Sequence, residues 1–192
     1  MKSNNKFIII GFNGSGKVAT ATKLSQLGIG VGKIFRTTET LGNIYSLSSV
    51  VYDSQEINNI FDNQSYIFMK ESIYRGLKYY EGLSFYEYQN NDVFIMTPDQ
   101  FNMVPKFDDN VVFIWLDTND SQRKFRYRKE KRKYDFASQE KQEKEYVHDF
   151  IDRINENKVI YFFNEEPDRV ATIIYGMVKH PDLVDAFIEN FN

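Results

Sequence analysis

The stretch Lys6–Val18, KFIIIGFNGSGKV, decides the fold of this chain. A short apolar run leads into a glycine-rich segment, and the residues that follow it have a helix-like composition. The spacing of Gly11, Gly16 and Lys17 is typical of a turn between a strand and a helix, in which backbone N–H groups surround phosphate oxygens and the lysine reaches the terminal phosphates. The sequence therefore predicts a phosphate-binding loop.

Val18 departs from the usual loop pattern, because a Ser or Thr hydroxyl ordinarily ligates Mg²⁺ at this position. A helix turns by about 100° per residue, so Thr20 points away from this site, and Thr22 lies on the same face but about 6 Å deeper. Mg²⁺ often keeps several waters and is held partly by substrate phosphates. We therefore expect weakened or rearranged metal binding, with the ligands supplied by the protein left unknown.

The composition sets outer limits on the class of protein. A chain of 192 residues with 42% hydrophobic residues can bury one substantial core, so we predict a single domain. The chain has no cysteine, which excludes disulfides and zinc thiolates. Only four strongly apolar residues precede Gly11, too few for a membrane span, so we expect a soluble cytoplasmic protein with no membrane partner. A net charge of −3 gives no global reason to expect nucleic-acid binding.

Apolar runs alternate with helical patterns along the chain. Strand-like runs without in-out alternation lie at 6–10, 31–36, 92–97, 110–116 and 158–163. Helical patterns lie at 16–27, 54–62, 121–133, 138–157 and 167–179, with a short last one at 181–192. The alternation predicts a three-layer α/β fold of the P-loop type, with a five-stranded, mainly parallel sheet covered on both faces.

A concentrated basic segment follows the fourth of these strands. Eight of the eleven residues from Arg123 to Lys133 are Arg or Lys, and a second helix carrying Arg153 comes next. Two helices joined at a basic tip can fold over a nucleotide, and phosphoryl transfer requires such arginines because its transition state spreads charge over oxygens. A solvated helix face and a nucleic-acid patch are the alternative interpretations.

The order of these motifs over residues 6–179 resembles that of guanylate kinases and related nucleoside monophosphate kinases. The resemblance implies a core of 1–36, 92–122 and 154–192, an acceptor-binding insertion at 37–91 and a lid at 123–153. It implies ATP contacts from Gly11, Asn13, Gly14, Ser15, Gly16, Lys17, Val18 and Asn164. It implies catalytic roles for Lys17, Arg123, Arg126, Arg128 and Arg153. On the acceptor side it implies Arg36, Thr37, Thr38, Glu71, Arg75, Tyr80, Ser84 and Asp99.

The acceptor side departs from the family pattern. Where the family has Thr-Thr-Arg-x-x-Arg, residues 37–42 of this chain are TTETLG, so both arginines that clamp the acceptor phosphate are missing. Either Arg36, Arg75 or Tyr80 holds this phosphate, or the substrate differs from GMP. Glu71 is the best counterpart of the guanine-reading glutamate, and an ordinary solvated glutamate is an equal alternative.

The resemblance implies transfer of a phosphoryl group from ATP, with Mg²⁺, to a (deoxy)nucleoside monophosphate. GMP or dGMP is favoured, and dTMP, dUMP or a modified pyrimidine nucleotide is the close alternative. A catalytically weak, guanylate-kinase-like binding module is a further alternative, as is a P-loop protein that binds nucleic acid through 123–133, although nucleic acid is the less favoured partner. Both monomer and homodimer fit the sequence.

Overall fold

The computed structural model of the chain describes residues 5–32, 34–38, 66–74, 77–129, 136–163 and 165–191. In chain order these form β1 (Lys6–Ile10), α1 (Lys17–Gln26), β2 (Phe35–Thr38), β3 (Tyr66–Tyr74), β4 (Leu77–Ser84), α3 (Phe85–Asn90), β5 (Val93–Met96), α4 (Pro98–Met103), β6 (Val111–Asp117), α5 (Asp120–Lys129), α6 (Phe136–Ile154), β7 (Val159–Phe163), α7 (Pro167–Lys179), the 3₁₀ helix η1 (Pro181–Leu183) and α8 (Val184–Phe191). The predicted helix at 54–62 lies outside the described residues.

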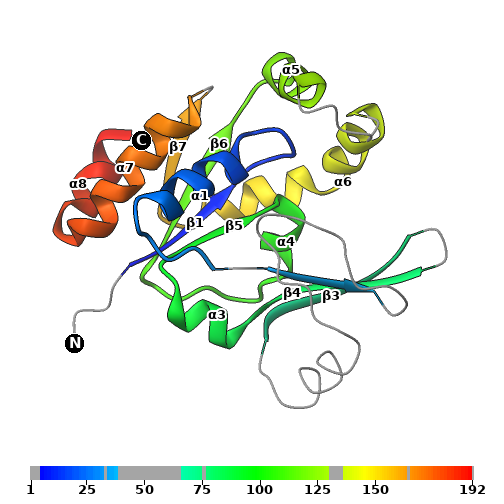
Figure 1. Ribbon diagram of the computed structural model, residues 1–192, viewed down its shortest axis with the longest axis horizontal. Helices are drawn as coiled ribbons and strands as arrows, with labels where there is room; N and C mark the ends of the chain where they lie inside the picture. Colours follow the sequence, from blue (N-terminus) through cyan, green and yellow to red (C-terminus); the bar gives the residue numbers. More distant parts are fainter. Residues whose placement is uncertain are drawn as a thin grey trace.

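A parallel sheet in the order β5-β1-β6-β7 forms the centre of the molecule (Figure 1). Its strands are nearly continuous apolar runs, and the side chains of β5 and of all but the last residue of β6 are buried. Because successive side chains of a strand point to opposite faces, such runs need a covering layer on both faces. The predicted α/β fold with a parallel sheet is confirmed.

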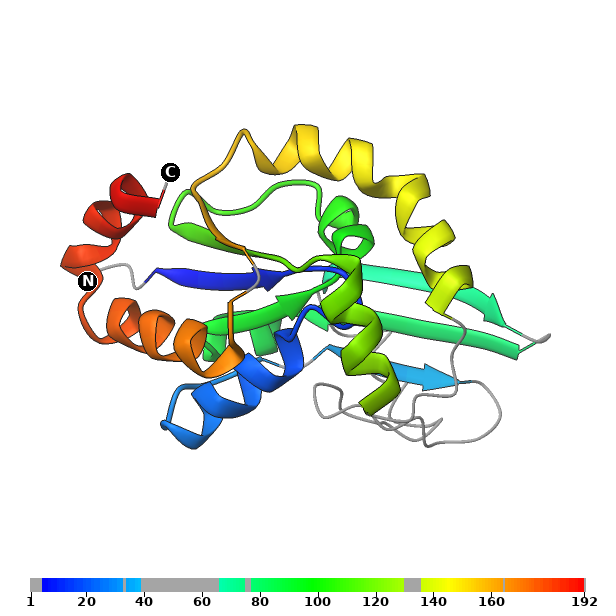
Figure 2. The ribbon, with the colours of Figure 1, turned by 90° about the horizontal axis from the view of Figure 1, so that it is seen from above.

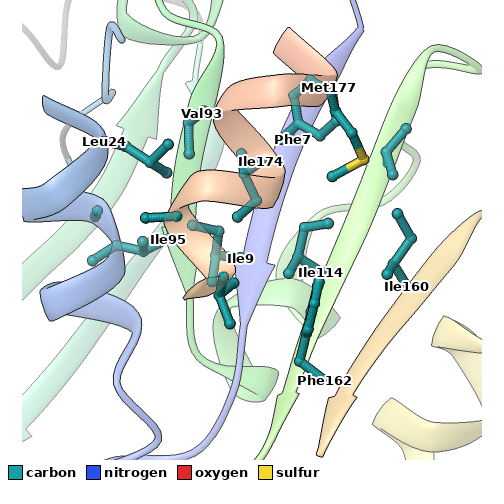
Figure 3. Close-up of a cluster of buried hydrophobic side chains, with 14 of the residues drawn as sticks. Phe7, Ile9, Leu24, Val93, Ile95, Ile114, Ile160, Phe162, Ile174 and Met177 are labelled. Atoms are coloured by element: carbon teal, nitrogen blue, oxygen red, sulfur yellow. The ribbon is translucent and has the colours of Figure 1, made fainter. Parts of the chain in front are cut away.

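Helices cover the two faces of this sheet, as Figure 2 shows from above. Phe7 and Ile9 of β1 pack on one face in a cluster that includes Leu24 of α1 and Ile174 of α7 (Figure 3). On the opposite face Ile8 and Ile10 belong to a second cluster, which includes Phe101 of α4 and Phe150 of α6. The strand before the glycine loop and the helix after it are therefore both held in a packed core.

The fifth strand predicted for the parallel sheet is not confirmed. Of the predicted run 31–36, Val31 forms only an isolated bridge with Val93, and the chain then leaves β5. Gly32 packs directly against the ring of Phe94. A Cβ at position 32 would lie 2.1 Å from a carbon of this ring, so only glycine permits such a close approach. The remainder of the run, from Phe35, forms β2 in a second sheet.

The second sheet is antiparallel, in the order β2-β4-β3. The sequence did not lead us to predict β3 and β4 as strands. It also did not lead us to predict the short helices α3, after β4, and α4, after β5. Ser84 starts α3 by accepting a hydrogen bond from the backbone N–H of Glu87 (3.2 Å). Pro98 and a capping box between Thr97 and Gln100 start α4. Except for Phe35 and Arg36 of β2, this sheet lies within 37–91, the segment predicted as the acceptor-binding insertion.

The helical predictions for the second half of the chain agree with the structure. α5 and α6 occupy most of the predicted 121–133 and 138–157, and α7 matches 167–179. The last predicted helix, 181–192, is divided into η1 and α8. Within the described part of the chain, no helix is both long and apolar enough to cross a membrane.

Candidate functional site

The loop between β1 and α1 is shaped by three glycines. Gly14 and Gly16 have φ angles of 80° and 106°, in the left-handed region that favours glycine. A Cβ on Gly11 would lie 2.5 Å from Ser15 Oγ, so only glycine lets the two ends of the loop approach this closely. The predicted phosphate-loop pattern thus coincides with a tight turn that opens into the N-terminus of α1, where backbone N–H groups attract anions.

Lys17, the first residue of α1, is buried against this loop. Its Nζ donates hydrogen bonds to the carbonyl oxygens of Gly11 and Phe12, the latter at 2.9 Å. These carbonyls fix the position of the ammonium group without neutralising its charge. The lysine is therefore held at the loop as a positive charge that favours an anion.

Hydroxyl groups around the loop bear on metal binding. Val18 packs against the core cluster beneath α1, and the Thr22 hydroxyl donates to the Val18 carbonyl oxygen (2.8 Å). Within the described segments, Ser15 Oγ and Thr20 Oγ1 are buried and have no hydrogen-bond partner. No group of three His, Cys, Asp or Glu side chains suited to a metal occurs among the described residues. The residues at the loop therefore do not fit a direct protein site for Mg²⁺.

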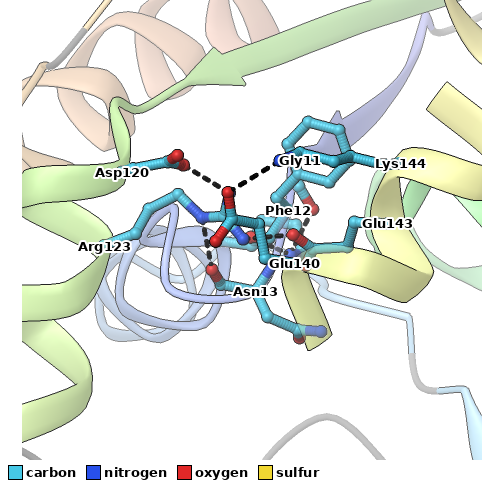
Figure 4. Close-up of polar contacts among 9 residues, drawn as sticks. Gly11, Phe12, Asn13, Asp120, Arg123, Glu140, Glu143 and Lys144 are labelled. Carbon is cyan, nitrogen blue, oxygen red and sulfur yellow. Dashed lines mark hydrogen bonds and ion pairs between the residues drawn. The ribbon is translucent and has the colours of Figure 1, made fainter. Parts of the chain in front are cut away.

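Arg123 of α5 reaches the loop and is almost completely engaged there (Figure 4). Its Nε donates to the Asn13 carbonyl oxygen at 2.9 Å, its Nη1 pairs with Asp120 at 3.1 Å, and its Nη2 pairs with Glu143 of α6. The guanidinium carbon lies 5.1 Å from the ring centroids of both Phe12 and Phe136. The Arg123 side chain is only 5% exposed, and its contacts join the loop to both α5 and α6.

Glu143 and Thr118 contact the loop although neither was predicted, and the Thr118 hydroxyl donates to the Ser15 carbonyl oxygen at 3.1 Å. The Oε1 of Glu143 accepts the backbone N–H of Asn13 at 3.0 Å, while its other oxygen pairs with Arg123. The Asn13 residue is thus bound at its N–H by a carboxylate and at its carbonyl by a guanidinium. Glu143 lies on the inner stripe of α6, in line with the apolar residues Phe136, Val147 and Phe150. A charged residue among these apolar positions is the feature of the sequence from which a functional contact could have been predicted.

Arg126 of α5 contacts the other side of the loop. Its Nη1 donates to the carbonyl oxygens of Ser15 (2.6 Å) and Gly14 (3.2 Å). The same nitrogen would lie 3.3 Å from a Cβ on Gly16, and Pro167 of α7 would lie 3.1 Å from that Cβ. Two predicted lid arginines are therefore at the loop. Others in the basic segment, Lys124, Arg128 and Lys129, are exposed.

Arg153 occupies a different place. Near the C-terminal end of α6, its guanidinium donates to carbonyl oxygens at the end of α4, those of Phe101 (3.1 Å), Asn102 (2.8 Å) and Val104. Glu143, which touches the loop, is ten residues earlier, or about 15 Å along the helix. The structure does not bring Arg153 to the loop, and its bonds tie α6 to the segment after α4.

Asp99 and Lys70 form an ion pair where the second sheet meets the parallel sheet. β5 ends at Met96, which is paired with Ile10, the residue before the loop, so Asp99 lies at the same edge of the sheet as the loop. Its Oδ2 lies 3.2 Å from Lys70 Nζ of β3, and its other oxygen accepts from the Thr97 hydroxyl. Lys70 was not among the predicted site residues.

The other predicted acceptor residues lie in the second sheet or outside the described residues. Tyr80 of β4 is paired with Thr37 on one side and with Glu71 on the other, so these three form one row across the strands. The neighbouring row joins Arg36, Glu81 and Lys70, and Thr38 pairs with Tyr79. Ser84 caps α3, a structural role. Arg75 and Asn164 lie outside the described residues.

The end of β6 also faces the loop. The Leu116 carbonyl oxygen would lie 3.0 Å from a Cβ on Gly11, and Asp117 follows directly. Although Asp117 is exposed at the end of β6, partial desolvation raises its pKa above the ordinary value of 3.8, because the ionised carboxyl group loses some of its solvation. The carboxyl ends of β1, β5 and β6 thus converge with α5 around the loop, the edge at which parallel α/β sheets bind ligands.

Comparison with known proteins gives a fold but no family. No family model matches the sequence, and no curated protein matches it. Among solved structures, the chain is similar to a guanylate kinase from Anaplasma phagocytophilum, with a TM-score of 0.51 and 15% sequence identity over 93% of this chain and 86% of that chain. The chain therefore has a guanylate-kinase-like fold.

Proposed function

We propose that this chain is a nucleoside monophosphate kinase, which transfers the terminal phosphoryl group of ATP to a (deoxy)nucleoside monophosphate. The observation that carries the proposal is the meeting of Lys17 and Arg126 at one glycine loop, with the Lys70–Asp99 pair at the adjoining sheet edge. Phosphoryl transfer depends mainly on positioned positive charge and needs little covalent chemistry from the protein. A loop for the donor and a separate sheet for the acceptor meet that need.

On the donor side, Lys17 and the loop N–H groups would hold the ATP phosphates. Arg126 donates to neutral carbonyl oxygens, which it can exchange for charged phosphate oxygens with a gain in hydrogen-bond strength. Arg128, exposed on the same helix, is a second candidate for the transferring group. Arg153 has no part in this proposal.

Mg²⁺ would enter with the nucleotide and remain on its phosphate oxygens and water. Val18 offers no oxygen, and the described residues provide no cluster of metal ligands. Mg²⁺ tolerates such binding because it usually keeps several waters. The roles proposed for the residues of this chain do not depend on a protein-bound metal.

On the acceptor side, we assign the acceptor phosphate to Lys70. Both clamp arginines of the family pattern are absent from residues 37–42, whereas Lys70 places a cation beside Asp99 at the edge near the loop. Asp99 would orient the Lys70 ammonium group, which would in turn donate to the acceptor phosphate. The guanylate-kinase-like fold favours GMP or dGMP as the acceptor. A pyrimidine deoxynucleotide is the alternative acceptor, because a lysine stands in place of the arginine clamp.

The test is ADP release from ATP across a panel of ribo- and deoxynucleoside monophosphates. We expect at least one acceptor, GMP or dGMP first, to raise ADP release well above the rate without acceptor. Lys17→Met should abolish the increase, and Lys144→Met, a change at an exposed lysine of α6, should leave it intact. Equal ADP release with every acceptor and with none would overturn the proposal in favour of a catalytically weak binding module.

A further inference from the structure

The Glu143 carboxylate occupies a place built for an anion. Its two oxygens accept from two donors of different origin, the backbone N–H of Asn13 in the glycine loop and the Nη2 of Arg123 in the lid. The side chains of both Arg123 and Glu143 are 5% exposed. A carboxylate and a phosphoryl group both present two or more oxygens on one central atom, so the same donor pair suits either anion.

The position of Glu143 in its helix argues against a purely structural role. Its neighbours on the inner stripe of α6, Val147 and Phe150, are apolar, and Phe150 is fully buried. Burying an ion pair costs desolvation that an apolar side chain would avoid, so an ion pair at this position is weak support for stability alone. The Glu143 carboxylate instead accepts the backbone N–H of Asn13, a loop donor that would otherwise be open to a ligand.

We propose that the Asn13 N–H and Arg123 form the subsite for the terminal phosphate of the donor nucleotide, and that Glu143 fills this subsite as an internal anion until ATP displaces it. The inference rests on the proposed function. The amides at the start of α1 and Lys17 would hold the inner phosphates, which leaves the Asn13 N–H, on the lid side, for the outermost one.

Arg123 is suited to such an exchange because its other contacts do not involve Glu143. Its Nε remains on the Asn13 carbonyl oxygen, its Nη1 remains on Asp120, and it lies between the rings of Phe12 and Phe136. Only the Nη2 changes its partner, from a carboxylate oxygen to a phosphate oxygen. The guanidinium therefore stays in place while the anion is exchanged.

The exchange makes Glu143 a residue that discriminates between donor nucleotides. ATP must displace the carboxylate, whereas ADP, which has no terminal phosphate, leaves it in place. Removing the charge of Glu143 should therefore strengthen ATP binding and leave ADP binding unchanged. A carboxylate that served only as a counterion to Arg123 would have the same effect on both nucleotides.

The test is the Kd of ATP and of ADP, each measured by calorimetry without acceptor, for the wild-type chain, Glu143→Gln and Glu143→Met. Glutamine keeps an oxygen for the Asn13 N–H without the charge, and methionine restores an apolar stripe of similar length. We expect both variants to bind ATP about tenfold more tightly, with ADP within about twofold of the wild type. Glu145→Gln, an exposed change on the same helix, should alter neither Kd.

A measurement on the wild-type chain keeps the inference testable if both variants unfold. In amide NMR spectra, the Asn13 N–H resonance should shift with ATP and stay in place with ADP, while the resonances of Gly16 and Lys17 shift with both nucleotides. Equal ATP affinity in wild type and variants, or an Asn13 shift alike with ATP and ADP, overturns the inference and leaves the kinase proposal standing. Absence of ATP binding in every form overturns both.

Discussion

The glycine loop, with α5 and α6 beside it, and the second sheet are built in different ways. The loop is one continuous stretch, Gly11–Lys17, and side chains of α5 and α6 form hydrogen bonds with its backbone. The second sheet joins β2 to the distant strands β4 and β3, and Phe68 and Leu83 pack it against the core cluster of Ile8 and Ile10. Among the described residues, the Lys70–Asp99 ion pair links β3 to the sheet edge near the loop. Side chains of two helices fix the loop, whereas strand pairing shapes the second sheet, so we expect changes in the two regions to have separable effects.

Removing Lys17 tests the donor region and should have the largest effect. Lys17→Met keeps the aliphatic stem but removes the charge held at the loop by the Gly11 and Phe12 carbonyls. We expect kcat/KM to fall by about 10³, since a charged donor to transferring phosphates is lost. Steady-state kinetics with the best acceptor measures this. A loss below about tenfold would mean that the loop does not hold the donor.

Removing Lys70 tests the acceptor region. Lys70→Met should raise the KM of the nucleoside monophosphate by about ten- to a hundredfold, because a charge-assisted hydrogen bond to its phosphate is lost. The Kd of ATP should stay unchanged. Lys106→Met, at an exposed position after α4, is the matched control and should change neither quantity. A weakened ATP affinity in Lys70→Met would contradict the division between the two regions.

Removing Arg153 separates support from catalysis. Arg153→Met loses hydrogen bonds to the carbonyl oxygens at the end of α4, so the free energy of unfolding should fall by about 1–3 kcal/mol with kcat unchanged. Chemical denaturation and kinetics on the same samples measure both. Arg169→Met, which removes an exposed pair with Glu165, should cost less than about 1 kcal/mol. A large drop in kcat with intact stability would return Arg153 to the reaction.

Restoring a hydroxyl at position 18 tests metal binding at the loop. Val18→Ser should lower the Mg²⁺ concentration for half-maximal ATP binding about three- to tenfold, because a direct oxygen ligand becomes available. It should also cost about 1 kcal/mol of stability through lost packing on the core. A calorimetric titration of ATP at several Mg²⁺ concentrations decides the point, and an unchanged half-saturation would mean that position 18 does not govern the metal.

Asp117 gives the smallest expected effect, a change in the pH dependence of stability. Because partial desolvation raises its folded-state pKa above 3.8, its contribution to stability is fully present below that value and is lost as pH rises through the folded-state pKa. Asp117→Asn should therefore gain stability relative to the wild type as pH rises from about 4 to 7. Urea denaturation across this range measures the difference, and a constant or falling difference would contradict the raised pKa.

The two regions also differ in how far the sequence predicts them. The loop could be predicted because local steric demands, such as the left-handed Gly14 and Gly16, leave a pattern in adjacent residues. β3 begins with an apolar run, Tyr66–Met69, but Lys70, Glu71 and Ser72 interrupt it, and β4 mixes polar and apolar residues throughout, so neither was predicted as a strand. The break of the run 31–36 depends on the packing of Gly32 against Phe94, a contact between distant residues.

Within the candidate site, side chains whose partners are distant in sequence were not predicted. Glu143 and Lys70 obtain their significance from α6 lying on the loop and from β3 lying beside α4, and neither has a local motif. Arg153 shows the opposite case. Its helix was predicted to be part of a lid, so we expected Arg153 near the loop, but α6 is long enough to place it at the end of α4. Long-range packing decided these three positions.

The central claim is that the chain transfers a phosphoryl group between two nucleotides held in these two regions. Incubation with ATP labelled in its terminal phosphate and a nucleoside monophosphate tests this most directly. The account predicts that the label appears in the nucleoside diphosphate, and that Lys17→Met abolishes the transfer. Label found only in inorganic phosphate, or left entirely in ATP with every acceptor, would contradict it.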